Sequence, residues 1–143
     1  MMKIGFIGTG LMGLPMAKNI LKAGLNLKAY NRSKSKAEPL KEFGAEISNT
    51  LKEAVSNSDI IITMLTDDTA IDEVMSSPDF LDSLKSGATV IDMSSVKPTT
   101  AIKHGDNLKS KNINYLDAPV SGGTIGAEEA SLAIMVGGEQ NNF

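Results

Sequence analysis

The sequence predicts an α/β fold in which helices cover both faces of a doubly wound, mostly parallel sheet. Strand-like and helix-like segments alternate along most of the 143 residues. The run at residues 60–65 is almost continuously apolar, which is typical of a central parallel strand buried on both faces. A glycine-rich turn over residues 8–13 joins the first strand to the first helix. Together these observations predict right-handed units of strand, helix and strand.

Short apolar runs and glycine stop signals set the expected order of elements. The expected strands cover residues 3–8, 25–30, 45–47, 60–65, 89–93 and 114–118. The expected helices cover residues 12–23, 35–43, 51–56, 69–75 and 99–109, with Gly24, Gly44 and Gly87 as helix stops or turns. After Ala118, a glycine-rich turn over residues 121–126 precedes another strand candidate at 132–136.

The glycine-rich turn has the spacing of a loop that holds a dinucleotide pyrophosphate. Gly8 permits a tight turn, Gly10 lets the backbone approach the phosphates, and Gly13 lets the helix pack closely on the strand. The free N–H groups and the positive dipole end of the helix then face the anion. The alternative is a chance cluster of glycines in a strand-to-helix turn. The expected cofactor-binding residues here are Gly8, Thr9, Gly10, Leu11, Met12 and Gly13.

The residues after the second expected strand, Asn31, Arg32 and Ser33, indicate which dinucleotide is preferred. No carboxylate stands there to bind an adenosine ribose or to repel a 2′-phosphate. Asn31 is expected to hydrogen-bond the ribose, Arg32 to pair with a 2′-phosphate, and Ser33 to donate from its hydroxyl. NADP, with NADPH preferred over NADH, is therefore the expected cofactor. The alternative is a solvated basic loop in which Ser33 or Ser35 caps the next helix.

Met64 and Leu65 follow the fourth expected strand at its carboxyl end, the edge where ligands bind in open parallel sheets. We expect backbone and apolar contacts from these two residues to the cofactor. Asp67 and Asp68 come next, and for them we favour a capping role at the start of the following helix.

Hydroxyl groups also follow the fifth and sixth expected strands. Ser94 and Ser95 either contact the nicotinamide ribose or the substrate, or begin the next helix. Ser121, Gly122 and Gly123 offer a hydroxyl and exposed N–H groups that suit a carboxylate. A glycine turn after proline also occurs without any ligand.

Composition narrows the classes of function. The net charge is −3 with no basic tract, so neither nucleic acid nor an anionic membrane is an expected partner. The chain has no cysteine, which excludes disulfides and cysteine-based metal sites and suits a reducing cytoplasm. No metal site is expected. His104, the only histidine, lies on an expected surface helix with no matching acid nearby, so we predict that it is exposed and not catalytic.

Four motifs, taken together and in this order, resemble those of the β-hydroxyacid dehydrogenase family, which includes 3-hydroxyisobutyrate dehydrogenases and tartronate semialdehyde (2-hydroxy-3-oxopropionate) reductases. They lie at residues 5–17, 30–33, 92–95 and 117–123, and the segment 132–138 is also family-like. The motif at 117–123 is the most discriminating, because many dinucleotide-binding folds share the first. The chain departs from the family pattern at Thr66, where proline is usual, and at Lys97.

The resemblance implies a Rossmann-type domain over residues 1–143 that binds NADP(H) through the glycine turn, Arg32, residues 64–65 and Ser95. It implies a substrate carboxylate held by residues 121–123. Family members carry their catalytic lysine after the position of Phe143, followed by an all-helical domain that completes the substrate pocket and usually forms the subunit interface. Neither is in this chain, so we expect a truncated domain with no catalytic residue, inactive alone, whose full-length form is a homo-oligomer.

The function that the resemblance implies is hydride transfer between nicotinamide and a small 3-hydroxy acid or its semialdehyde, by an NADP-dependent oxidoreductase of the cytoplasm. The expected partner is a small carboxylate-bearing substrate. The alternative is a non-catalytic module that binds a dinucleotide or docks a partner. A relative of 6-phosphogluconate dehydrogenase is less favoured, because a sugar phosphate requires more basic residues than the neutral turn at 121–126 provides.

Overall fold

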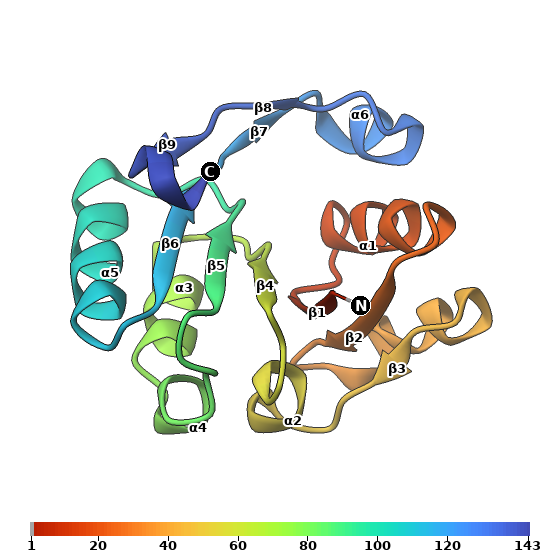
Figure 1. Ribbon diagram of the computed structural model, residues 1–143. Coiled ribbons are helices and arrows are strands. Elements are labelled where there is room, and N and C mark those ends of the chain that lie inside the picture. Colours follow the sequence, from red (N-terminus) through yellow and green to blue (C-terminus); the bar gives the residue numbers. More distant parts are fainter. Residues whose placement is uncertain (1) are drawn as a thin grey trace.

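The computed structural model describes residues 2–143 and confirms the doubly wound α/β architecture (Figure 1). The strands are β1 (Lys3–Ile7), β2 (Asn26–Tyr30), β3 (Glu46–Ile47), β4 (Ile60–Thr63), β5 (Thr89–Asp92), β6 (Asn114–Asp117), β7 (Val120–Ser121), β8 (Ala133–Ile134) and β9 (Gly137–Gly138). Seven of them form one sheet in the order β3-β2-β1-β4-β5-β6-β9. Strands β1 to β6 are parallel, β9 is antiparallel to β6, and β7 pairs with β8 in a separate ribbon.

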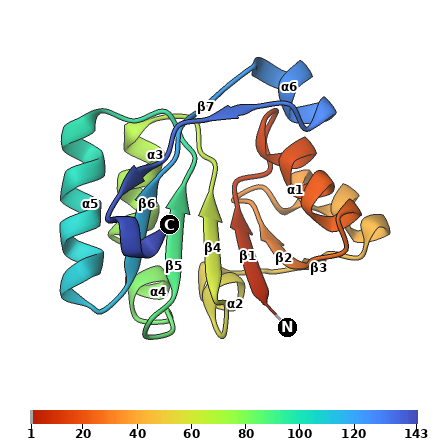
Figure 2. The same cartoon turned by 45° about the horizontal axis from the view of Figure 1, so that its top comes forward.

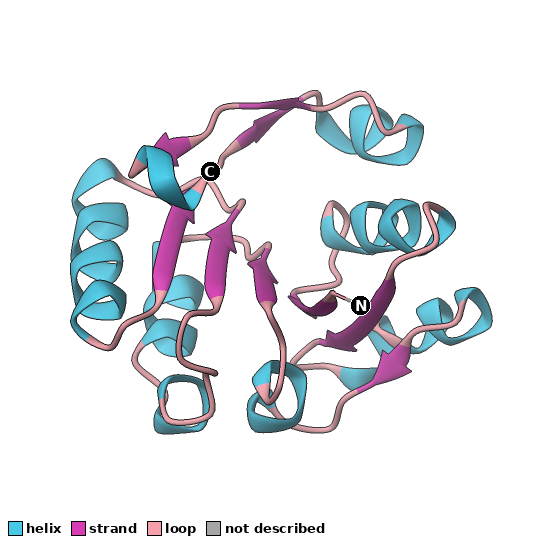
Figure 3. Ribbon diagram, in the orientation of Figure 1, coloured by secondary structure: helices cyan, strands magenta, loops and turns pink. Residues whose placement is uncertain are grey.

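Helices connect the strands and cover both faces of the sheet (Figure 3). The α-helices are α1 (Gly13–Lys22), α2 (Leu51–Val55), α3 (Asp68–Met75), α4 (Pro78–Leu81), α5 (Pro98–Ser110) and α6 (Gly123–Glu129), and the 3-10 helices are η1 (Lys34–Lys36), η2 (Glu38–Phe43) and η3 (Gln140–Asn142). Helix α1 and η2 share one face, and α2, α3, α4 and α5 pack on the other. Within residues 2–143, no helix has the length and apolar character needed to cross a membrane.

The core is divided in two by the sheet, because successive residues of a strand point to opposite faces. Phe6 joins Met16 of α1 in one apolar cluster, whereas Ile7 and Ile61 belong to the cluster under α2 to α5. On β4, Ile61 is 0% exposed and Ile62 is 8% exposed, which confirms a central strand covered on both faces. Burial of each such side chain contributes roughly 1.5–3 kcal/mol to folding.

The segment from β7 through α6 to β8 forms an arch over the carboxyl ends of the strands (Figure 2). Helix α6 packs on α1, where the side-chain amide of Asn19 donates to the carbonyl oxygen of Ala127 at 2.6 Å. The prediction of a plain turn over residues 121–126 is wrong from Gly123 onward, where α6 begins. Its glycines lower helix propensity and hide the helix from sequence analysis, and contact with α1 stabilises it.

Two other elements differ from expectation. Residues 35–43 form η1 and η2 in place of one α-helix, because Pro39 has no N–H to donate and restricts the backbone of Glu38 before it. Helix α4 was not predicted, since four residues are too few to show a helical period. The strand expected at 132–136 is reduced to β8, and β9 extends the main sheet after it.

His104 is buried, so the prediction that it is exposed is wrong. It lies on α5, is 3% exposed, and its Nε2 atom is 2.6 Å from Oδ1 of Asp72 on α3. The packing of α5 against α3 brings these two residues together from positions 32 apart in sequence. That separation conceals the partner acid from a search of the neighbouring sequence.

Candidate nucleotide-binding site

The candidate site lies where the strand order changes direction, between the carboxyl ends of β1 and β4. Ile7 pairs with Thr63 there, while β2 lies on the other side of β1. Doubly wound sheets bind ligands in the crevice at this switch point. The parallel strands all end at the same edge of the molecule, near the arch (Figure 2). The loops after β1, β2, β4 and β5 are therefore close to one another.

The three glycines of the turn differ in what surrounds them. Gly8 has a φ of 102°, and a Cβ there would collide with the Met64 carbonyl oxygen. A Cβ on Gly13 would collide with the Gly8 carbonyl oxygen. A Cβ on Gly10 would meet no atom within 4 Å. Protein packing accounts for Gly8 and Gly13, whereas the space beside Gly10 opens to solvent.

Among residues 2–143, no N-cap side chain hydrogen-bonds to the N-terminus of α1. Its N-cap, Met12, makes no capping hydrogen bond, and the first turn has no acidic residue. Helices α2 and α3 differ, because Thr50 and Asp67 accept hydrogen bonds from the first-turn amides at 3.1 and 2.9 Å. The capping role favoured for Asp67 is thus confirmed. The N-terminus of α1 leaves room for an anion from outside the chain.

Asn31 joins the glycine turn to the loop after β2. Its Oδ1 accepts from the Thr9 amide at 2.9 Å, and its Nδ2 donates to the Ser33 carbonyl oxygen at 3.0 Å. This contact could not be predicted from local sequence patterns, because it joins residues 22 positions apart. Thr9 is 2% exposed, and its Oγ1 is buried without a hydrogen-bond partner among residues 2–143.

Arg32 lies in the loop that follows β2. Its side chain is 90% exposed, and its guanidinium lies 3.7 Å from the Glu73 carboxylate on α3. Ser33 beside it is also exposed. Arg32 therefore lies at the sheet edge where β2 ends, and its ion pair with Glu73 is on the surface.

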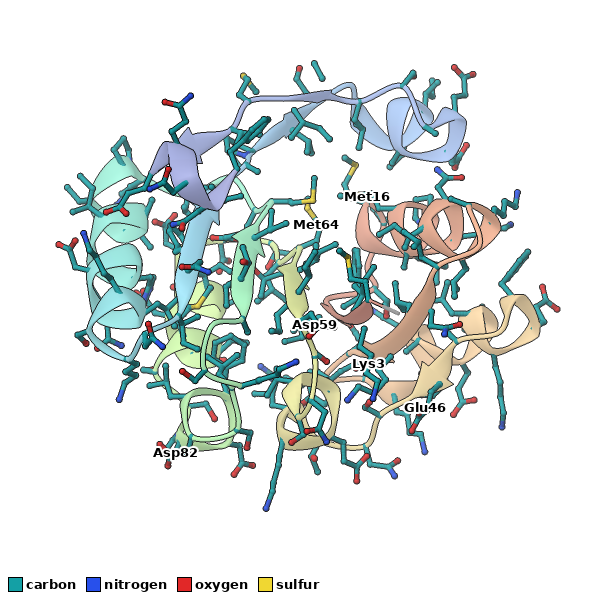
Figure 4. The ribbon with its side chains drawn as sticks, in the orientation of Figure 1. Lys3, Met16, Glu46, Asp59, Met64 and Asp82 are labelled. Atoms are coloured by element: carbon teal, nitrogen blue, oxygen red, sulfur yellow. The ribbon has the colours of Figure 1, made fainter. Side chains whose placement is uncertain are left out.

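Met64 and Leu65 lie beneath the glycine turn. The Met64 amide donates to the Ile7 carbonyl oxygen at 2.9 Å, and the Leu65 amide donates to Ser94 Oγ at 2.8 Å. In Figure 4, the side chains of Met16 and Met64 point into the same space between α1 and the arch. Both thioethers thus lie beside the candidate site and suit an apolar ligand surface.

Ser94 and Ser95 do not start the next helix. Helix α5 begins at Pro98 with Lys97 as its N-cap. Ser94 is buried against Leu65, and Ser95 is exposed. Asp68 binds the start of α5, accepting from the Lys97 amide at 3.0 Å and from Thr100 Oγ1 at 2.7 Å.

A buried acidic group at the ends of β5 and β6 has no role in the sequence analysis. Asp92 and Asp117 are neighbours in register, and burial raises the pKa of each. Repulsion from the Asp92 charge raises the pKa of Asp117 further. Burial and the same two charges raise the pKa of Tyr115. Within the described residues, Asp92 Oδ2, Asp117 Oδ1 and the Tyr115 hydroxyl have no hydrogen-bond partner. The sequence signal for this group is an aspartate at the last position of each of two apolar strands.

The proposed carboxylate turn lies at the start of α6. Gly122 and Gly123 have φ values of 138° and 61°, and both are exposed along with Ser121. The N-terminus of α6 carries no side-chain cap. The hydroxyl and amides of this turn therefore remain accessible to solvent.

An apolar groove of about 490 Å³ runs between α1, the sheet and the arch. It is lined by Met16, Asn19, Ile20, Ile62, Ile91, Met93, Leu116, Ala118, Ala127, Ala130, Leu132, Ile134, Val136 and Phe143. Ile134 and Phe143 are 51% and 84% exposed.

The fold and the glycine turn define a dinucleotide-binding domain. A family model described as the NAD binding domain of 6-phosphogluconate dehydrogenase matches residues 3–143, and the chain belongs to this family. Its named relatives are β-hydroxyacid dehydrogenases, which confirms the resemblance. The chain is 41% identical over 142 residues to the 2-(hydroxymethyl)glutarate dehydrogenase of Eubacterium barkeri. It is 41% identical over 144 residues to the 2-hydroxy-3-oxopropionate reductase of Escherichia coli.

These matches cover 99% of the chain but 47% and 49% of the two relatives, so the chain spans about half of their length. Solved structures agree. The Mycobacterium tuberculosis 3-hydroxyisobutyrate dehydrogenase with L-serine superposes with a TM-score of 0.93 at 34% identity, covering 99% of this chain and 48% of that one.

Solved neighbours hold both forms of the dinucleotide. Psf3, in complex with NADP+ and 2-OPP, superposes with a TM-score of 0.92 at 28% identity. The match covers 96% of this chain and 49% of the Psf3 chain. An imine reductase variant from Myxococcus stipitatus, in complex with NAD+, has a TM-score of 0.90 at 25% identity, with coverage of 99% and 48%.

Proposed function

We propose that this chain is the NADP(H)-binding domain of an oxidoreductase that transfers hydride between nicotinamide and a small 3-hydroxy acid or its semialdehyde. The observation that carries the proposal is the free space at Gly10. Folding explains the absence of a side chain at Gly8 and Gly13 but not at Gly10. A ligand that approaches the backbone closely does explain it. The uncapped N-terminus of α1 supports an anionic ligand at the same place.

The cofactor fits the residues that the structure brings together. Residues 8–13 would hold the pyrophosphate, and the unpartnered Thr9 hydroxyl would gain a hydrogen-bond partner there. Met64, Leu65 and Ser95 would contact the rest of the dinucleotide. Asn31 Oδ1 already accepts a hydrogen bond from the Thr9 amide, so Asn31 would bind a ribose through Nδ2. When bound, the nicotinamide ring supplies or accepts the hydride.

Arg32 supports a preference for NADPH over NADH. Its guanidinium is exposed, and a 2′-phosphate would offer it a doubly charged bidentate partner. Solved neighbours with NADP+ and with NAD+ share this fold, so the fold alone does not decide the preference. The proposal assigns it to residues 31–33.

Substrate binding and catalysis complete the proposal. Ser121, Gly122 and Gly123 would hold the substrate carboxylate through a hydroxyl and backbone amides. The proton donor and the rest of the substrate pocket would come from a second, helical domain, which would also make the subunit interface. The chain by itself would bind the cofactor and turn over little substrate, and we place the full protein in the cytoplasm. A non-catalytic binding module remains the alternative, and a turnover assay of the longer protein with a semialdehyde separates the two.

The proposal is tested by titrating the chain with NADPH and NADH while following the fluorescence of the reduced nicotinamide. The wild type should bind NADPH more tightly than NADH. Gly10→Ala should keep its melting temperature, because the new Cβ meets no protein atom, and should lose about tenfold or more in affinity. Gly137→Ala is the matched control, since a Cβ there has only an ordinary contact and lies in β9. Unchanged affinity in Gly10→Ala, or no binding by the wild type, would refute the proposal.

A further inference from the structure

A fully buried polar network connects β4 to β5 beneath the candidate site. Thr63 and Asp92 are side by side in the parallel register at the last positions of these strands. Thr63, Asp92 and Ser94 are each 0% exposed. Polar side chains at such positions have to find partners within the protein, because they are not exposed to solvent.

Asp92 Oδ1 is the centre of this network. It accepts a hydrogen bond from Thr63 Oγ1 at 2.9 Å and another from the Ser94 amide at 3.1 Å. Ser94 Oγ in turn accepts from the Leu65 amide at 2.8 Å. The loop after β5 is thus tied to the loop after β4 through one carboxylate oxygen and one hydroxyl.

The network continues to the glycine turn by packing. A Cβ on Gly8 would collide with the Met64 carbonyl oxygen and would lie 2.9 Å from Leu65 Cδ2, so Gly8 rests directly on this loop. The Gly8 amide also donates to the Tyr30 carbonyl oxygen at 2.9 Å. A shift of Met64 and Leu65 therefore changes the support of the turn that would hold the pyrophosphate.

A carboxyl group is a costly choice for this position. It is buried beside Asp117 and Tyr115, with His104 of α5 as a nearby group that favours its charge. Its Oδ2 has no hydrogen-bond partner among residues 2–143. An apolar side chain would fill the same space without that cost, so packing alone does not explain Asp92.

We propose that Asp92 is a positioning residue whose carboxylate, acting through Ser94 and Leu65, fixes the loops after β4 and β5 in the conformation that accepts the dinucleotide. The inference rests on the proposed function, because it assumes that these loops and the glycine turn contact that ligand. It adds to that function a residue that touches no ligand and controls affinity through two hydrogen bonds.

The test compares three variants of the 143-residue chain with the wild type. Asp92→Ala removes the central acceptor, Ser94→Ala removes the link to the Leu65 amide, and Asp92→Asn keeps a carbonyl acceptor. NADPH affinity is measured at a temperature where every variant is folded. Asp92→Ala and Ser94→Ala should weaken binding about three- to tenfold, and Asp92→Asn should recover most of that loss. If Asp92→Ala does not fold, Ser94→Ala decides the result.

Val55→Ala is the control for lost stability, because Val55 is fully buried on α2, away from the network. It should lower the melting temperature and leave NADPH affinity within twofold of the wild type. Equal weakening by Val55→Ala, or unchanged affinity in folded Ser94→Ala and Asp92→Ala, would overturn the inference.

Amide hydrogen exchange in the ligand-free chain gives a second readout. Protection of the Leu65 amide should fall at least tenfold in Ser94→Ala beyond any global change, which Val55→Ala measures. Unchanged protection would overturn the positioning role even if affinity falls. A wild type that binds no dinucleotide but shows the expected loss of protection would refute the proposed function, and the network would then order these loops for another purpose.

Discussion

The Arg32 guanidinium lies 3.7 Å from the Glu73 carboxylate, so the cation at the end of β2 already has an anionic neighbour on α3. Both side chains are mostly exposed, at 90% and 63%, and such pairs contribute about 0–1 kcal/mol. A 2′-phosphate carries more charge and accepts two parallel hydrogen bonds. Arg32 should therefore exchange the weaker partner for the stronger one when NADPH binds.

Arg32→Ala should weaken NADPH binding by about 10- to 100-fold and leave NADH binding within about threefold, because only NADPH has the additional phosphate. Parallel titrations of the two cofactors measure this. Lys41→Ala removes another exposed cation, on η2, and should leave both affinities unchanged. An equal loss for NADPH and NADH would show that Arg32 does not read the 2′-phosphate.

Glu73→Gln should tighten NADPH binding about two- to fivefold, because Arg32 no longer leaves an ion pair to meet the phosphate. Asp82→Asn removes an exposed negative charge from the C-cap of α4, on the side of the molecule away from the arch (Figure 4), and should change nothing. In an Arg32→Ala background, Glu73→Gln should also have no effect. If Glu73→Gln still raises NADPH affinity in the absence of Arg32, the effect comes from the overall charge and not from the ion pair.

Gly13→Ala should destabilise the fold by about 3 kcal/mol or more, since its Cβ would collide with a backbone oxygen that cannot move aside. Urea unfolding followed by circular dichroism measures the loss. Gly10→Ala on the same turn should stay within about 1 kcal/mol of the wild type. Similar stabilities for the two variants would contradict the tight contact of α1 with the Gly8 carbonyl.

The Asp72–His104 pair should make stability depend on pH in acid. The hydrogen bond with His104, helped by Lys103, lowers the pKa of Asp72 below its ordinary value. Because this pKa is lower in the folded state, the pair stabilises the folded protein at pH values above about 3.9, the pKa of an aspartate in the unfolded chain. The stabilisation is lost as the pH falls through the pKa of Asp72 in the folded state. The wild type should thus exceed Asp72→Asn in urea midpoint at pH 6, and the difference should shrink by pH 3. A difference that is constant across this range would contradict the prediction.

The apolar groove under the arch should make the isolated chain self-associate as its concentration rises. Ile134→Lys places a charge in the groove and should lower the mass measured by light scattering after size exclusion. Ile102→Lys, at a site 63% exposed on α5, is the control and should leave the mass unchanged. A monomer at every concentration would contradict this prediction.

The order of strands and helices follows from local patterns, because apolar runs and glycine stops act within a few residues. The central position of β4 was predictable from Ile60, Ile61 and Ile62 alone. Helix α6 was not predictable in this way. Its stability depends on α1, where Asn19 meets Ala127 from 108 positions away.

The candidate site, like the fold, was predictable from the sequence only where local patterns define it. The turn at residues 8–13 is predictable from its glycine spacing, and Arg32 is predictable from its charge and its position after a strand. The Asp92 network and the Asn31–Thr9 bond join residues 22 to 29 positions apart and exist only after the strands pair. His104 shows the same limit, because its burial depends on a different helix.

The hydrogen bond from Asn19 to Ala127 joins α1, which follows the glycine turn, to α6, which begins at Gly123. Under the proposed function, a nucleotide and a carboxylate would occupy the two ends of this joined pair. Ordering a helix on ligand binding costs conformational entropy, and a ligand that orders one helix would reduce this cost for the ligand at the other helix. By thermodynamic linkage, each ligand would raise the affinity for the other by the same factor. Cooperative uptake of the two ligands would then originate in a single side-chain amide that touches neither.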